Sequence, residues 1–167
     1  MKLSLFTTSL ILTGSLYASN AHHMSQTQEG VHAVKLLDKT LQTNLINKLK
    51  EDNNSTTTME VCITEANKTM KEVKEKLPAH VKMSLASLDT TETQPHATDL
   101  EIMTKYQKDI KKKTDGAMMI TTAKVGNILR VYKPLVINTV WLQCHDDNST
   151  VKVGDFKGVI ISEVSKH

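Results

Sequence analysis

The chain has 167 residues, a length typical of one domain, and its 39% of hydrophobic residues is enough to form a core. Its net charge of +3 is too small to indicate a nucleic-acid partner. The only dense basic cluster, at residues 111–113, follows an expected helix and is typical of a solvated helix end. The composition therefore predicts a globular domain that does not bind nucleic acid.

Residues 1–21 have the pattern of a secretory signal peptide. One lysine precedes an apolar run from Leu3 to Leu16, and small residues follow as far as Ala21. Because this run is too short to cross a bilayer, we expect cleavage after Ala21, a periplasmic location and no membrane span in the mature chain. Cleavage after Ala18 and an uncleaved anchor are the alternatives. In an oxidising compartment, cysteines tend to be paired, attached to a group or catalytic.

Two long helices are expected after the signal peptide. Apolar residues at three- and four-residue spacing predict the first of them over residues 31–49. A second apolar stripe predicts a helix that residues 56–58 would cap and Pro78 would end; its members are Met59, Cys62, Ala66, Met70, Val73 and Leu77. The spacing places Cys62 on the inner face, where a small buried core residue is the simplest interpretation.

The remainder predicts a sheet with one more helix. Alternation of Val81, Met83 and Leu85 indicates a half-buried strand. Asp99 is expected to cap a helix whose inner side carries Leu100, Met103, Tyr106 and Ile110. Three strand-like runs follow, with a hairpin turn at Gly126-Asn127 and with Pro134 indicating an edge or a bulge; they are residues 117–124, 128–137 and 151–164. The predicted fold class is α+β, an antiparallel sheet covered by helices and preceded by long N-terminal helices.

The connection at residues 138–150 contains the candidate chemistry. It carries the only tryptophan, Trp141, together with Cys144 and His145. A Cys-x-x-Cys-His stretch attaches haem because its two thiols add to the vinyl groups while the adjacent histidine binds the iron. Since Trp141 stands three residues before Cys144, one thioether bond and an axial His145 remain, but a second thioether does not.

The segments 132-YKPLVINTVWLQCH-145 and 152-KVGDFKGVIIS-162 resemble a family of exported c-type haem domains with a PAS-like fold. Its members are stand-alone periplasmic proteins or sensor modules, and they typically show Tyr-Lys-Pro, then Cys-x-x-Cys-His, then Val-Gly-Asp-x-x-Gly. The similarity extends more loosely upstream. The resemblance implies a PAS-like domain over residues 56–167, preceded by a helical segment at residues 22–55.

The same resemblance implies a haem c site. Cys144 would attach the haem and His145 would bind the iron. The position opposite His145 would be taken by Cys62 as the second axial ligand or would be open. Trp141, Tyr132 and Lys133 would lie beside the cofactor. The implied function is redox or gas sensing or electron transfer without enzymatic activity, in which a separate redox or signalling protein would be the partner.

The sequence departs from the family pattern in ways that weaken the cofactor inference more than the fold inference. Trp141 replaces the first attachment cysteine, Asp146 stands where the family usually has glycine, and residues 86–99 lack the family's basic groups. The main alternative is a haem-free PAS-like binding module held by a Cys62–Cys144 disulfide. A nucleophilic enzyme using Cys144 and His145 is disfavoured, because adjacent side chains usually point apart. A structural zinc site is disfavoured as well, since no histidine has a zinc-motif spacing to a cysteine.

Overall fold

The computed structural model describes residues 24–51, 59–88, 95–144 and 150–166. The expected signal peptide, the capping residues 56–58 and His145 lie outside these ranges. The elements in chain order are α1 (Gln26–Glu51), α2 (Met59–Lys76), β1 (Val81–Ala86), α3 (Ala97–Lys111), β2 (Thr121–Val125), β3 (Ile128–Val136), α4 (Thr139–Leu142) and β4 (Phe156–Ser165). None of the helices in these ranges is long and apolar enough to cross a membrane.

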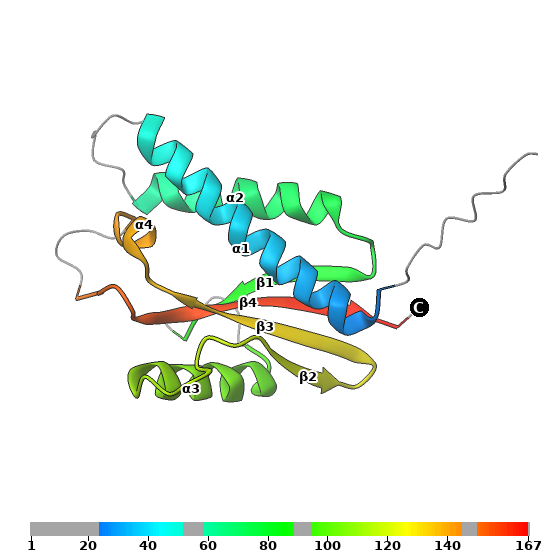
Figure 1. The fold of residues 1–167 in the computed structure, drawn as a ribbon. Helices are drawn as coiled ribbons and strands as arrows, with labels where there is room; N and C mark the ends of the chain where they lie inside the picture. The colour runs from blue at the N-terminus through cyan, green and yellow to red at the C-terminus, as the bar shows by residue number, and fades with distance from the viewer. Residues whose placement is uncertain (1–23, 52–58, 89–94, 145–149, 167) are drawn as a thin grey trace, which may run out of the picture.

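The four strands form one antiparallel sheet in the order β1-β4-β3-β2, with α1 and α2 over one face and α3 over the other (Figure 1). The predicted α+β class is therefore confirmed. Its expected long N-terminal helices precede the sheet, although β1 and α3 separate them from the remaining strands. The central strands β3 and β4 have helices on both sides, which explains their nearly continuous apolar sequences.

Alternation along β3 and β4 divides the core into two parts. Val131 and Ile160 face α1 and α2 in one cluster, whereas their neighbours Tyr132 and Ile161 face α3 in the other. A one-residue slip of either strand would exchange these two sets of side chains. The pairing of β3 with β4, in which Tyr132 lies opposite Ile161, is thus fixed by the need to bury both faces.

The hairpin prediction is confirmed. Pro134 lies just before an irregularity of the pairing, as the predicted bulge requires, but β3 is a central strand of the sheet and not an edge strand. Gly126 has a φ of 59° in the turn between β2 and β3, a conformation that glycine adopts without strain. Strand β2 pairs with residues 128–132 of β3, so Pro134 lies past the end of β2, where its missing N–H costs no ladder bond on that side. A register irregularity follows directly, between Leu135 and Val136.

Some local expectations were wrong. Met59, Leu85 and Leu100 were expected to face inward, but they are 39%, 42% and 42% exposed. Met59 lies at the very start of α2, and the buried stripe of that helix begins only at Cys62. Two strands are also shorter than predicted, because residues 115–119 and 153–154 form turns before β2 and β4 begin.

Helix α1 lies close to the sheet at Gly30. A methyl group at this position would lie 2.4 Å from Cγ2 of Val131, and the Ser162 hydroxyl donates a hydrogen bond of 3.0 Å to the Gly30 carbonyl. The buried hydroxyl of Ser162 is thereby satisfied inside an apolar layer. Glycine at position 30 therefore sets the distance between α1 and the sheet.

We predict that Gly30→Ala destabilises the protein by about 1–3 kcal/mol, as expected for overpacking. On an exposed helical surface the same change would instead stabilise by up to about 1 kcal/mol, because alanine is the better helix former. Denaturant unfolding of Gly30→Ala measures the difference. Lys35→Ala, at an exposed position on the same helix, is the control and should stay within about 0.5 kcal/mol of the parent. A gain of stability in Gly30→Ala would contradict the close approach.

Candidate functional site

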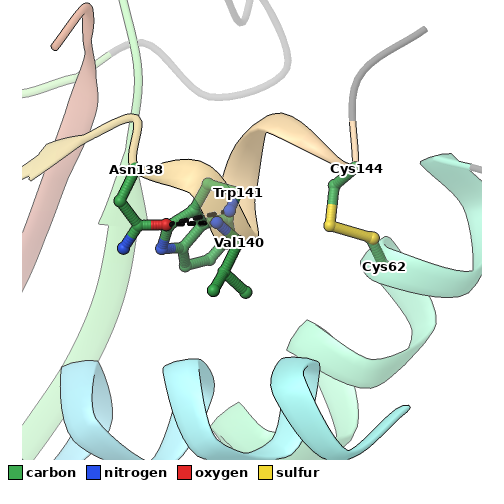
Figure 2. Close-up of a disulfide and its surroundings, with 5 residues drawn as sticks. All are labelled: Cys62, Asn138, Val140, Trp141 and Cys144. Atoms are coloured by element: carbon green, nitrogen blue, oxygen red, sulfur yellow. Dashed lines mark hydrogen bonds between the residues drawn. A yellow bond between two sulfur atoms is a disulfide. The ribbon is translucent and has the colours of Figure 1, made fainter. Parts of the chain in front are cut away.

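The two cysteines form a disulfide that joins the start of α2 to the end of α4. The Cys62 and Cys144 sulfur atoms are 2.11 Å apart, and their Cα atoms are 5.8 Å apart. Figure 2 shows this bond bridging the two segments, with Trp141 and Val140 on the neighbouring turn. Both cysteines are buried in a small cluster with Leu45 of α1. The disulfide therefore closes a separation of 82 residues inside the protein, away from solvent.

Short-range hydrogen bonds define the turn that carries Cys144. The side-chain oxygen of Asn138 caps α4 by accepting from the backbone N–H groups of Val140 and Trp141, at 3.0 and 2.9 Å (Figure 2). The backbone N–H of Cys144 then donates to the Trp141 carbonyl at 3.1 Å, which continues the turn. Because α4 has only four residues, this cap is what holds its geometry.

The remaining residues assigned to the haem site do not converge on one place. Tyr132 and Lys133 are consecutive on β3 and point to opposite faces of the sheet. The Tyr132 hydroxyl lies under α3, where it donates to Asp99, whereas Lys133 forms an ion pair of 3.0 Å with Asp38 of α1. Trp141 packs on the α1 and α2 side, against both the main core and the disulfide cluster.

As arranged, these residues do not fit a covalently attached haem. A thioether would need the Cys144 sulfur and a thiolate ligand would need the Cys62 sulfur, but each sulfur is bonded to the other. His145, the expected axial ligand, falls in the segment 145–149 that the structure does not describe. Within the described ranges, no three His, Cys, Asp or Glu side chains come close enough together to hold a metal ion.

A buried polar network under α3 was not anticipated from the sequence. The Arg130 guanidinium donates to both carboxylate oxygens of Asp99, at 2.6 and 2.7 Å, and it also contacts Glu163, its cross-strand partner on β4. The Tyr132 hydroxyl donates to the same Asp99 at 2.8 Å. Asp99 itself accepts from the backbone N–H of His96, which is the actual N-cap of α3. The network therefore ties the first turn of α3 to both central strands.

This network explains why Leu100 is exposed. Asp99, expected to be the cap, is the third residue of α3 and occupies the inward position beside the sheet, so the next residue is turned outward. One sequence signal could have indicated the network. Arg130 is the only arginine of a lysine-rich chain, and it stands among apolar residues of a strand, where a planar two-pronged donor suits a buried carboxylate better than lysine does.

The network shifts the ionisation of its members. Burial raises the pKa of Tyr132, and the hydrogen bond and negative charge of Asp99 raise it further, since both favour the protonated hydroxyl. For Arg130, burial opposes the charge, but the hydrogen bond and charge of Asp99, with the charge of Glu163, outweigh it and raise the pKa. We infer that the arginine stays charged and Tyr132 stays neutral throughout the physiological range.

Comparison with known proteins returned no match to a family model, a curated protein or a solved structure.

We predict that the Cys62→Ser/Cys144→Ser variant loses about 4 kcal/mol of unfolding free energy, the loop-closure contribution for a separation of this size. Denaturant unfolding with and without dithiothreitol measures the loss. The parent protein should approach the variant once it is reduced, whereas the variant should not respond to reductant. Equal stability of the oxidised parent and the variant would show that the bond does not constrain the chain.

Alkaline pH should reveal the Tyr132 network. Because the folded-state pKa of Tyr132 lies above its ordinary value of 10.0, its contribution to stability is complete below that pH and is lost as the pH rises towards the folded-state pKa. Tyr132→Phe should cost about 1.5–3 kcal/mol at neutral pH, because the lost hydrogen bond is to a carboxylate. Its stability should then fall less steeply than that of the parent as the pH rises above about 10. Parallel losses in the two proteins, measured by urea unfolding, would rule out this coupling.

Proposed function

We propose that the protein is a haem-free, exported binding module with a PAS-like arrangement of sheet and helices, stabilised by the Cys62–Cys144 disulfide. The observation that carries the proposal is the disulfide itself. It uses the Cys144 sulfur that would attach haem c and the Cys62 sulfur that is the candidate second axial ligand, in a buried cluster with Leu45 and with Trp141 packed beside it. The module is proposed to bind rather than to catalyse, and to act in an oxidising, periplasmic setting.

Trp141 is a second observation that supports a domain without haem. It stands at the position where the resembling family has its first attachment cysteine, and its side chain is packed partly buried between the core and the disulfide. A large indole in this place fills space beside the bond and adds apolar contact that a cysteine would not supply. Trp141 in place of one cysteine and the pairing of Cys144 with Cys62 both fit a domain without haem. In such a domain the disulfide, and not a thioether bond to haem, is the covalent cross-link.

The competing proposal is a haem domain with one thioether from Cys144 and with His145 as axial ligand. The motif order from Tyr132 to Gly158 favours it, and it requires the disulfide to be open when haem is attached. In that case the redox or gas-sensing and electron-transfer roles implied by the resemblance would apply, with a separate redox or signalling protein as partner.

One preparation separates the two proposals. The protein is exported by its own leader in a host with haem-maturation machinery, and its absorption spectrum, intact mass and thiol content under denaturing conditions are measured. We expect no haem absorption, the mass of the processed polypeptide less its two thiol hydrogens, and no free thiol. A covalent haem mass increment would overturn the proposal.

Cys62→Ser provides the matched control, because it opens the disulfide and leaves Cys144 free. If the module is haem-free by nature, this variant remains colourless and shows one free thiol. Haem uptake by Cys62→Ser, but not by the parent, would instead show that the disulfide blocks a functional attachment site.

A further inference from the structure

The end of the connection after β3 differs from its beginning in how it is held. At the beginning, the backbone N–H of Ile137 donates to the Asp155 carbonyl at 2.9 Å, and the Ile137 carbonyl accepts from Gly154 at 2.8 Å. Residues 138–144, the α4 segment, by contrast form their described hydrogen bonds with one another, through the Asn138 cap and the backbone of the turn. Within the described part of the chain, no hydrogen bond or ion pair joins this segment to α1 or α2.

Two kinds of contact hold the α4 segment against the helices: the disulfide and apolar packing. Leu45 of α1 is buried in one cluster with Cys62 and Cys144, and Val140 and Trp141 pack beside that cluster. Figure 2 shows these two side chains on the short turn that leads to Cys144. Since apolar contacts have no preferred direction, the disulfide is the contact of defined geometry that keeps the segment in place.

The α4 segment has little stability without these contacts. Its helix has four residues, and an isolated helix shorter than about 12 residues is marginal in water. Away from α1 and α2, the turn and its Asn138 cap are therefore not expected to persist. The pairing of β3 with β4 does not include this segment and is buried on both faces. Opening of the segment thus breaks fewer contacts than unfolding of the sheet, and regions with few contacts open at lower free energy.

The burial of the two sulfur atoms links this opening to redox chemistry. Cys62 and Cys144 are 5% and 3% exposed, so a dissolved thiol has almost no access to their bond in the closed form. Exchange requires a thiolate to attack one sulfur of the disulfide directly. The bond therefore reacts only after the cover around it has opened, and the α4 segment is a weakly attached part of that cover.

We propose that the α4 segment is a redox-controlled latch, which opens from α1 and α2 while the sheet stays folded and remains open once the disulfide is reduced. The reductant is a dithiol. One of its thiolates attacks the Cys62–Cys144 bond and releases one cysteine thiol, and its second thiol then displaces the other. The reductant becomes a disulfide, and the protein gains two electrons and two protons. Release of the segment uncovers Leu45, which is 1% exposed in the closed form. This inference goes beyond the proposed binding function, in which the disulfide serves as a fixed cross-link.

The rate of reduction distinguishes a local opening from global unfolding. Disulfide-bonded protein is treated with dithiothreitol at urea concentrations below its unfolding transition, and free thiols are trapped with iodoacetamide and counted by mass spectrometry. We expect the rate to change little with urea, because the effect of urea scales with the surface exposed and the α4 segment is short. A rate that rises from the lowest urea concentrations with the slope of global unfolding would overturn the proposal.

The reduced protein shows whether the latch stays open. Trp141 is the only tryptophan of the chain, so its fluorescence reports on the α4 segment. We expect its emission to move to longer wavelength on reduction and to return when glutathione disulfide restores the bond. Amide hydrogen exchange should remain slow in β3 and β4, whose pairing is not disturbed. Unchanged emission, or rapid exchange throughout the sheet, would contradict the proposal.

Variants at two helix caps provide the matched test. Asn138→Ala removes the α4 cap and should speed reduction roughly fivefold, the factor that corresponds to a typical N-cap. Asn138→Asp retains an acceptor oxygen and should react at the parent rate. His96→Ala removes the cap of α3 on the opposite face of the sheet, so it should lower global stability but leave the reduction rate unchanged. Equal acceleration by Asn138→Ala and His96→Ala would mean that the bond is reduced through global unfolding, and would overturn the latch.

The tests of the latch and of the proposed function are separate. The mass and thiol content of the exported protein decide the proposed function, whereas the reduction rate and the Trp141 emission decide the latch. A bond that is reduced only through global unfolding would leave a haem-free, cross-linked module without a redox response. Covalent haem in the exported protein would overturn the proposed function and the latch together, since Cys144 would then carry the thioether.

Discussion

The covalent bond between Cys62 and Cys144 connects two parts of the molecule that lie 82 residues apart in the sequence. Helices α1 and α2 form a layer on one face of the sheet, and the bond fastens the start of α2 to the connection between the central strands β3 and β4. The described part of that connection contains the short helix α4, which has only four residues. The disulfide and the Asn138 cap together give it a defined place, and Trp141 is held with it.

The opposite face of the sheet is organised by charge. Arg130 and Asp99 are both largely buried, and a buried ion pair is favourable only when its remaining hydrogen-bonding groups are satisfied. Here Glu163, Tyr132 and the backbone of His96 supply most of those partners. The arrangement orients the first turn of α3, and the apolar contacts of Met103 and Tyr106 fix the rest of that helix. The C-terminal end of α3 is thereby positioned against the sheet, where Ile110 packs on the same cluster.

The two attachments lie on opposite faces of the sheet (Figure 1). The disulfide cluster with Leu45 and Trp141 holds the side covered by α1 and α2, whereas the contacts of Arg130 with Asp99 hold α3 against the other side. The connection after β3 and the first turn of α3 are therefore positioned by separate contacts.

The sequence by itself determined most of the helices and strands and the α+β fold class. Spacing of apolar residues located α1, α2 and β1, the Gly126-Asn127 pair located the hairpin, and Pro134 indicated the bulge in β3. All of these signals act between residues close in the chain. The sequence left open whether Cys62 and Cys144 would bind a cofactor or one another. Only the tertiary structure brought their Cα atoms to 5.8 Å, and only it placed Asp99 beneath Arg130 in the position expected for Leu100. Both outcomes depend on contacts between residues 31 or more positions apart, and no local pattern encodes which distant partner a thiol or a carboxylate will meet.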